Sequence, residues 1–94
     1  MSPFFQHHSS IIAVAGNGDT DGYQPMAFVC RQGVNFISND SDAYPILVNF
    51  DQPVGAGGTI RLLPGEIMSD LFIPCASLYV RAEGGQAPFR AVGA

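Results

Sequence analysis

The residues that could do acid–base or nucleophilic chemistry here are eight carboxylates, two histidines and two cysteines. A catalytic pair of carboxylates needs a pocket that raises the pKa of one member. Most carboxylates of this chain stand among turn-forming residues instead. Glu66 has the best position, directly after Pro64-Gly65, but a solvated turn carboxylate is the simpler interpretation there. The pattern predicts no hydrolytic carboxylate pair.

The histidines predict no nucleophilic or metal site. Nucleophilic catalysis needs Ser or Cys beside a His, and both histidines, His7 and His8, stand together near the N-terminus. Adjacent residues of a strand point to opposite faces, so they cannot hold one metal ion together. The Gly-rich stretches lack the Lys and Ser/Thr of a phosphate-binding loop. We therefore expect no catalytic residues, no cofactor and no enzymatic activity.

Residues 17–22 form the segment closest to a metal-binding pattern. Asn17, Asp19 and Asp21 place oxygen ligands at alternate positions before a glycine, as in the first half of a calcium loop. The twelfth position counted from Asn17 is Phe28 instead of Glu, and the flanks lack a helical pattern. These residue types are equally typical of an ordinary turn. A plain loop is favoured, and a weak calcium site at these three residues is the alternative.

The two cysteines, Cys30 and Cys75, both stand inside apolar segments. This position favours two buried thiols that pack as small hydrophobic groups. A disulfide that joins two sheets is the alternative for an exported protein. Neither cysteine belongs to a CxxC pair, so zinc is not expected.

Composition predicts a single all-β domain. The 94 residues are 47% hydrophobic and only 13% charged, with 11 Gly and 7 Pro, which favours short strands and tight turns. No segment keeps a helical periodicity for three turns without meeting Gly or Pro. The net charge of −4 and the absence of Lys argue against nucleic-acid binding, which needs a basic surface.

Nothing in the sequence predicts targeting to a membrane. No apolar run is long enough to span one. Ala13-Val14-Ala15 matches a signal-peptide cleavage site, but no Lys or Arg precedes it. We expect neither a signal peptide nor a membrane partner.

The strand pattern predicts a small β-sandwich or jelly-roll-like barrel over residues 11–94, preceded by an N-terminal arm at 1–10. The arm contains Phe4 and Phe5, which either tuck under its own domain or dock onto a neighbouring subunit. The expected strands cover residues 11–15, 26–31, 34–38, 44–50, 59–63 and 66–73, followed by two strands of a terminal hairpin.

The terminal hairpin is predicted from Gly84-Gly85, because both central residues of a type I′ turn need positive φ. Side-chain alternation then separates an apolar face from a solvated face. On the apolar face Ala82 lies opposite Ala87, Val80 opposite Phe89 and Leu78 opposite Ala91. On the solvated face Tyr79 lies opposite Arg90.

Two stretches resemble a known class of proteins. The first is Ile60-Arg-Leu-Leu-Pro-Gly-Glu-Ile, which is followed by an apolar run. The second is Leu78-Tyr79-Val80-Arg81-Ala82, which is followed by a Gly-rich turn and a final Val92. Residues 34–92 resemble small β-rich phage virion proteins. The resemblance implies a β-sandwich accessory protein of the virion, either a capsid decoration (cement) protein or a part of the tail or a fibre. It also implies a homo-oligomer, with a trimer favoured.

The function we expect is stabilisation of a phage shell by non-covalent contacts, in a virion assembled in the host cytoplasm. The partners would be the major capsid protein or other virion proteins. The residues expected at the interface are Phe4, Phe5, Tyr79, Arg81 and Arg90. The alternative is a tail- or fibre-associated module that binds a glycan or receptor through loops 17–22 and 51–58.

Overall fold

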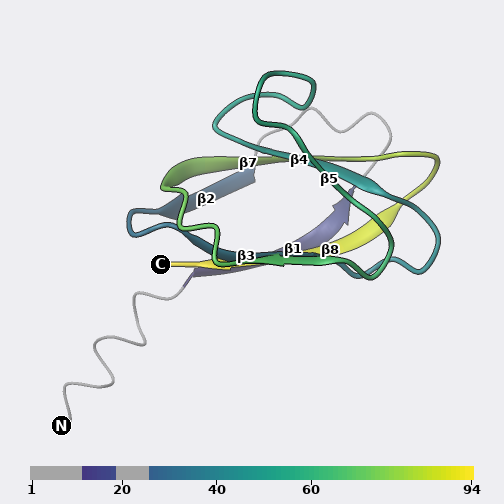
Figure 1. Ribbon diagram of the computed structural model, residues 1–94, viewed down its shortest axis with the longest axis horizontal. Helices are drawn as coiled ribbons and strands as arrows, with labels where there is room; N and C mark the ends of the chain where they lie inside the picture. Colours follow the sequence, from purple (N-terminus) through teal and green to yellow (C-terminus); the bar gives the residue numbers. More distant parts are fainter. Residues whose placement is uncertain (1–11, 19–25) are drawn as a thin grey trace, which may run out of the picture.

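A computed structural model describes residues 12–18 and 26–94 of the chain. These residues form eight strands in two antiparallel four-stranded sheets, with no helix among them. The two sheets lie one above the other (Figure 1). The prediction of an all-β fold and a small β-sandwich is confirmed, while the predicted N-terminal arm lies outside the described residues.

The first sheet contains, in spatial order, β1 (Ile12–Gly18), β8 (Ala87–Gly93), β3 (Val34–Asn39) and β6 (Ile67–Ser69). The second contains β2 (Met26–Cys30), β7 (Cys75–Ala82), β4 (Ile46–Phe50) and β5 (Ile60–Leu62).

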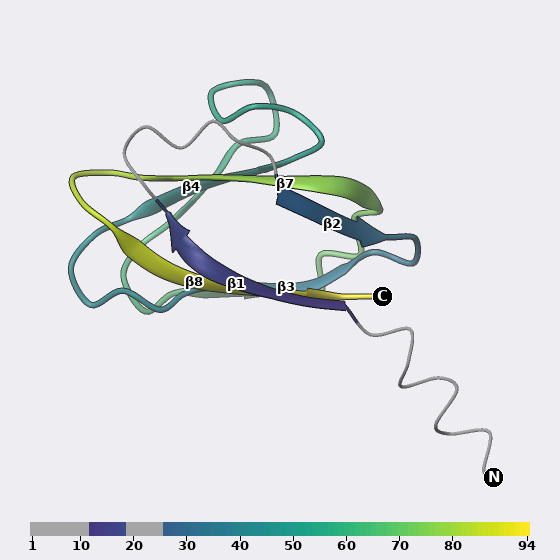
Figure 2. The ribbon, with the colours of Figure 1, turned by 180° about the vertical axis from the view of Figure 1, so that it is seen from behind.

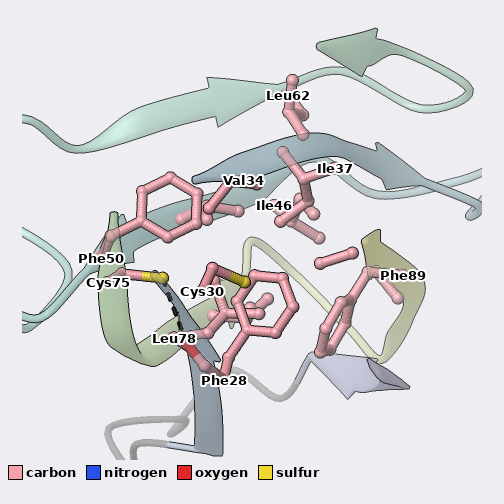
Figure 3. Close-up of a cluster of buried hydrophobic side chains, with 14 of the residues drawn as sticks. Phe28, Cys30, Val34, Ile37, Ile46, Phe50, Leu62, Cys75, Leu78 and Phe89 are labelled. Carbon is pink, nitrogen blue, oxygen red and sulfur yellow. Dashed lines mark hydrogen bonds between the residues drawn. The ribbon is translucent and has the colours of Figure 1, made fainter. Parts of the chain in front are cut away.

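The core forms between the sheets because side chains alternate along each strand. In β8, Phe89 is buried while its neighbours Pro88 and Arg90 are exposed. The largest fully buried side chains come from both sheets (Figure 3): Phe28, Ile37, Ile46, Leu62 and Leu78.

The predicted terminal hairpin is wrong, because β7 and β8 belong to different sheets. Strand β7 pairs with β2 and β4, whereas β8 pairs with β1 and β3. The segment between β7 and β8 therefore crosses from one layer to the other (Figure 2). The predicted apolar face is correct nevertheless: Leu78, Val80, Ala82, Ala87, Phe89 and Ala91 are all buried.

Contacts with the chain before β4 explain why Gly84-Gly85 does not close a hairpin. The amide of Glu83 donates to the carbonyl of Pro45 at 2.9 Å. The Tyr44 ring covers the glycines so closely that a Cβ on Gly85 would lie 2.5 Å from its Cε2 atom. The glycines are thus needed for close approach of this ring as well as for a turn.

A buried asparagine joins the two sheets at one end of the sandwich. Asn39, the last residue of β3, is 1% exposed. Its Nδ2 donates to the carbonyls of Tyr44, at 2.9 Å, and Leu62, at 3.1 Å. Its Oδ1 accepts from the amide of Ser41 at 3.0 Å. The Asn39 side chain therefore bonds to backbone groups in the turn after β3, in the segment before β4 and in β5, which belongs to the second sheet.

Asp51 anchors the connection that follows β4. Its φ of 63° is left-handed, a conformation that Asp and Asn tolerate better than other non-glycine residues. Its Oδ1 accepts from the amides of Ala76, at 2.8 Å, and Ser77, at 2.9 Å, and from the Ser77 hydroxyl at 3.2 Å. These bonds, that of Ala76 first, hold the pKa of the Asp51 carboxyl below its ordinary value of 3.8.

Replacing Asp51 by Asn should make the stability of the fold fall less as the pH is lowered into the acid range. Because the folded pKa lies below 3.8, ionised Asp51 stabilises the fold above that pH, and this contribution is lost as the pH falls through the folded pKa. Asn keeps an acceptor and tolerates the left-handed backbone but does not titrate. Urea midpoints should therefore fall less for Asp51→Asn than for the parent chain between about pH 5 and about pH 3. Equal falls would contradict this role of the carboxylate.

Candidate interaction surface

Exposed apolar side chains occur in β6 of the first sheet and in the segments on either side of it. We call Leu63, Ile67, Phe72 and Ile73 the β6 edge surface. Phe72 is 66% exposed and Ile67 is 59% exposed. Strand β6 ends the sheet order, so among the described residues no strand pairs with its outer side. An uncovered strand edge with exposed apolar groups is a template for association with another chain.

Strained backbone holds Phe72 in its exposed position. Asp70 and Phe72 have φ values of 57° and 50°, which cost a non-glycine residue about 1–2 kcal/mol each. Hydrogen bonds with the start of β3 maintain them. The amide of Phe72 donates to the carbonyl of Val34 at 2.8 Å, and the amide of Val34 donates to the carbonyl of Ile73 at 3.0 Å. The backbone of residues 72–73 is therefore hydrogen-bonded to β3, while the Phe72 ring faces solvent.

A groove of about 320 Å³ lies beside Phe72. Its seven lining residues include Asn35, Phe72 and Val92, and none of the seven carries an ionisable side chain. The volume is at the small end of the range for ligand pockets. Its side chains offer apolar and amide contacts, which suit the docking of a side chain.

Gly33 allows the wall of this groove to form. Its φ is +124°, and an added Cβ would lie 2.5 Å from the carbonyl carbon of Phe72. Ala94 lies over the same glycine, because the amides of Gln32 and Gly33 donate to its carbonyl at 2.7 and 3.2 Å. Only a glycine accommodates the Phe72 backbone this closely.

The three predicted interface residues that the structure describes are divided between the two sheets. Phe4 and Phe5 are outside the described residues. Tyr79 and Arg81 lie on β7, whereas Arg90 lies on β8 in the other sheet. The expected cross-strand placement of Tyr79 opposite Arg90 is therefore wrong, since the register sets Tyr79 opposite Asn49. A role for these residues in an interface stays a prediction.

Arg90 forms an ion pair with Asp40, with 2.6 Å between Nε and Oδ2. This hydrogen bond lowers the pKa of the Asp40 carboxyl. On the other sheet, Arg61 pairs with Glu83 at 3.0 Å and lowers the pKa of its carboxyl. Both pairs are largely exposed, so they contribute little to stability.

The calcium alternative is not tested by the structure. Asn17 lies in β1 opposite Pro88, and Asp19 and Asp21 lie outside the described residues. Within residues 12–18 and 26–94 no three His, Cys, Asp or Glu side chains gather in a way that could hold a metal ion. In the same ranges no helix is long and apolar enough to cross a membrane.

Comparison with protein-family models, with curated proteins and with solved structures finds no match to this chain. The site must therefore be interpreted from its own geometry.

Hydrogen bonds to neighbouring side chains of the same chain hold loop 51–58, which the sequence offers for glycan or receptor binding. The Nδ2 of Asn49 donates to the carbonyls of Pro53, at 3.2 Å, and Gly57, at 3.4 Å. The Thr59 hydroxyl donates to the carbonyl of Ala56 at 2.6 Å. These bonds occupy polar groups of the loop that a ligand would otherwise engage.

Sequence reasoning missed the β6 edge surface because it extended one strand over residues 66–73. The strand ends at Ser69, and the left-handed Asp70 starts an irregular segment. A signal was available in the run Leu71-Phe72-Ile73: three consecutive apolar residues cannot all face the core of a strand with one solvated side.

Proposed function

We propose that this chain is a structural subunit of a phage particle, a capsid decoration protein that binds the shell by non-covalent contacts as a homo-oligomer. The observation that carries the proposal is the β6 edge surface. It consists of four large exposed apolar side chains in β6 and the segments that flank it. The resemblance of residues 34–92 to virion accessory proteins supplies the identity of the assembly.

The chemistry of this edge fits a neighbour that covers it. Proteins protect exposed edges with charged residues, above all Lys, and this chain has no Lys at all. Glu66 stands beside Ile67, but its carboxylate accepts from the amide of Leu63 at 3.0 Å and so belongs to the local turn. A partner strand or loop would gain main-chain hydrogen bonds together with apolar contacts.

The groove beside Phe72 favours a specific interface, with a partner side chain in the groove, over non-specific apolar association. Interfaces draw most of their binding energy from a few anchors buried in pockets. A partner side chain placed in the groove would pack against Phe72 and Val92. Such a contact requires no catalytic residue.

The deciding experiment measures the copy number of the protein in purified particles by quantitative mass spectrometry against the major shell protein. A ratio near one, or a simple fraction of it, supports decoration of the shell. A few copies per particle would place the protein in the tail or a fibre and favour the receptor-binding alternative. Absence from the particles would overturn the proposal. Sedimentation equilibrium of the isolated protein should give a trimer.

Replacing Phe72 by Asn should weaken attachment to the particle by at least about tenfold in Kd, because an exposed aromatic anchor is lost. The fold should be retained, since the ring is 66% exposed and Asn tolerates the left-handed backbone. Co-sedimentation of labelled protein with particles that lack it measures the affinity.

The matched control is Val29→Thr, which alters an exposed apolar residue on the other sheet. It should bind as the parent does. Equal binding by Phe72→Asn and the parent chain would show that the β6 edge surface does not meet the shell.

A further inference from the structure

The two cysteines are direct partners across a pair of neighbouring strands. Cys30 ends β2 and Cys75 begins β7, and the antiparallel register sets their Cα atoms opposite each other. Directly opposite Cα atoms of antiparallel strands lie about 4.5–5.5 Å apart, within the range of about 4.4–6.8 Å that a disulfide spans. The expected alternative of a disulfide between two sheets is therefore wrong, because both residues belong to one sheet.

Both side chains point into the core and lie next to each other. Directly opposite residues project from the same face, and both cysteines are buried, at 0% and 8% exposure. Figure 3 shows the two sulfur atoms among the core side chains. The Cys75 thiol donates to the carbonyl of Phe28 at 3.2 Å. Both thiols are free in this structure.

From this geometry we infer that Cys30 and Cys75 are a modification site, an oxidisable dithiol that closes to a cross-strand disulfide when the chain meets a disulfide oxidant. One thiolate attacks the oxidant, forms a mixed disulfide and releases the first thiol of the oxidant. The second cysteine thiolate attacks the protein sulfur of that mixed disulfide and releases the second thiol. The chain loses two protons and two electrons, and the oxidant disulfide is reduced to two thiols.

Burial makes this site slow to react in the folded chain. Desolvation raises the pKa of the Cys75 thiol to about 11 and also raises that of Cys30. Because the thiolate is the nucleophile, both cysteines should react slowly while the sheet is closed. Strand β2 lies at the end of its sheet, so detachment of this short edge strand would expose them. The dithiol should therefore persist in a reducing cytoplasm and oxidise in an oxidising environment.

The test treats the full reduced chain with oxidised glutathione, once as the folded protein and once during refolding from urea. The expected product has lost two hydrogens in mass and carries no glutathione. Trypsin cleaves after Arg, so the disulfide should join the peptide 1–31 to the peptide 62–81. The folded protein should react more slowly than the refolding chain. The oxidised form should melt higher by on the order of 10 °C, and reduction should reverse the gain.

The variants Cys30→Ala and Cys75→Ala serve as matched controls. Each should acquire at most one glutathione, and neither should gain in melting temperature. The wild-type mass measurement decides the question even if a variant fails to fold. Mixed disulfides or disulfide-linked dimers as the only products of refolding would overturn the proposal, whatever the particle experiment shows.

Discussion

Asn39→Ala is expected to destabilise the fold by about 3–5 kcal/mol, one of the two largest effects of any substitution considered for this chain. The side chain is almost fully buried and forms three hydrogen bonds with backbone groups. Alanine would leave the carbonyls of Tyr44 and Leu62 and the amide of Ser41 without their partner. A buried polar group left unpaired costs about 1–3 kcal/mol.

Urea unfolding followed by circular dichroism measures this loss. The matched control is Asn35→Ala, on the same strand but exposed to solvent, which should change stability by less than about 0.5 kcal/mol. If the two variants unfold at the same urea concentration, the bonds of Asn39 do not hold the sheets together.

Gly33→Ala is the second substitution for which we expect a large loss, again about 3–5 kcal/mol. Two costs combine there. The φ of +124° is unfavourable for any residue with a Cβ, and the Cβ itself would lie 2.5 Å from the backbone of Phe72. The segment that carries Phe72 would have to leave the edge of β3, so the groove should be lost together with the stability.

Gly55→Ala separates these two costs. Gly55 also has a positive φ, of +101°, but a Cβ there would meet nothing within 4 Å. The conformational penalty alone should cost about 1–2 kcal/mol. The difference between the two variants in urea unfolding then measures the contact of Gly33 with Phe72. Equal losses would argue against that contact.

The sequence predicted the strands and their buried faces well because alternation and turn residues are local signals. The residues of β8 illustrate this: Ala87, Phe89 and Ala91 are buried as expected. Strand partners are not local. Gly84-Gly85 favours a hairpin because glycine readily adopts positive φ. The Tyr44 ring that packs against these glycines comes from about forty residues away in the chain.

The candidate surface was harder to predict for the same reason. Exposure of Phe72 depends on the left-handed backbone of residues 70 and 72 and on hydrogen bonds to β3. The run Leu71-Phe72-Ile73 indicates that one of its residues leaves the core, but it does not indicate which one. The cysteines were correctly expected in the core, but their being opposite each other depends on the pairing of β2 with β7. The type of a side chain predicted whether it is buried. Which buried residues lie next to each other depends on how distant strands pair.

The position of β8 has a consequence for how this protein is made. The strand lies between β1 and β3 and pairs with both, yet it comes after the other seven described strands in the sequence. During synthesis β1 therefore leaves the ribosome without its only partner in the described sheets and must wait until residues 87–93 emerge. Folding of this sheet should be slow, as expected where contacts join distant parts of a sequence. Until then the apolar faces of the nascent strands are exposed to other chains.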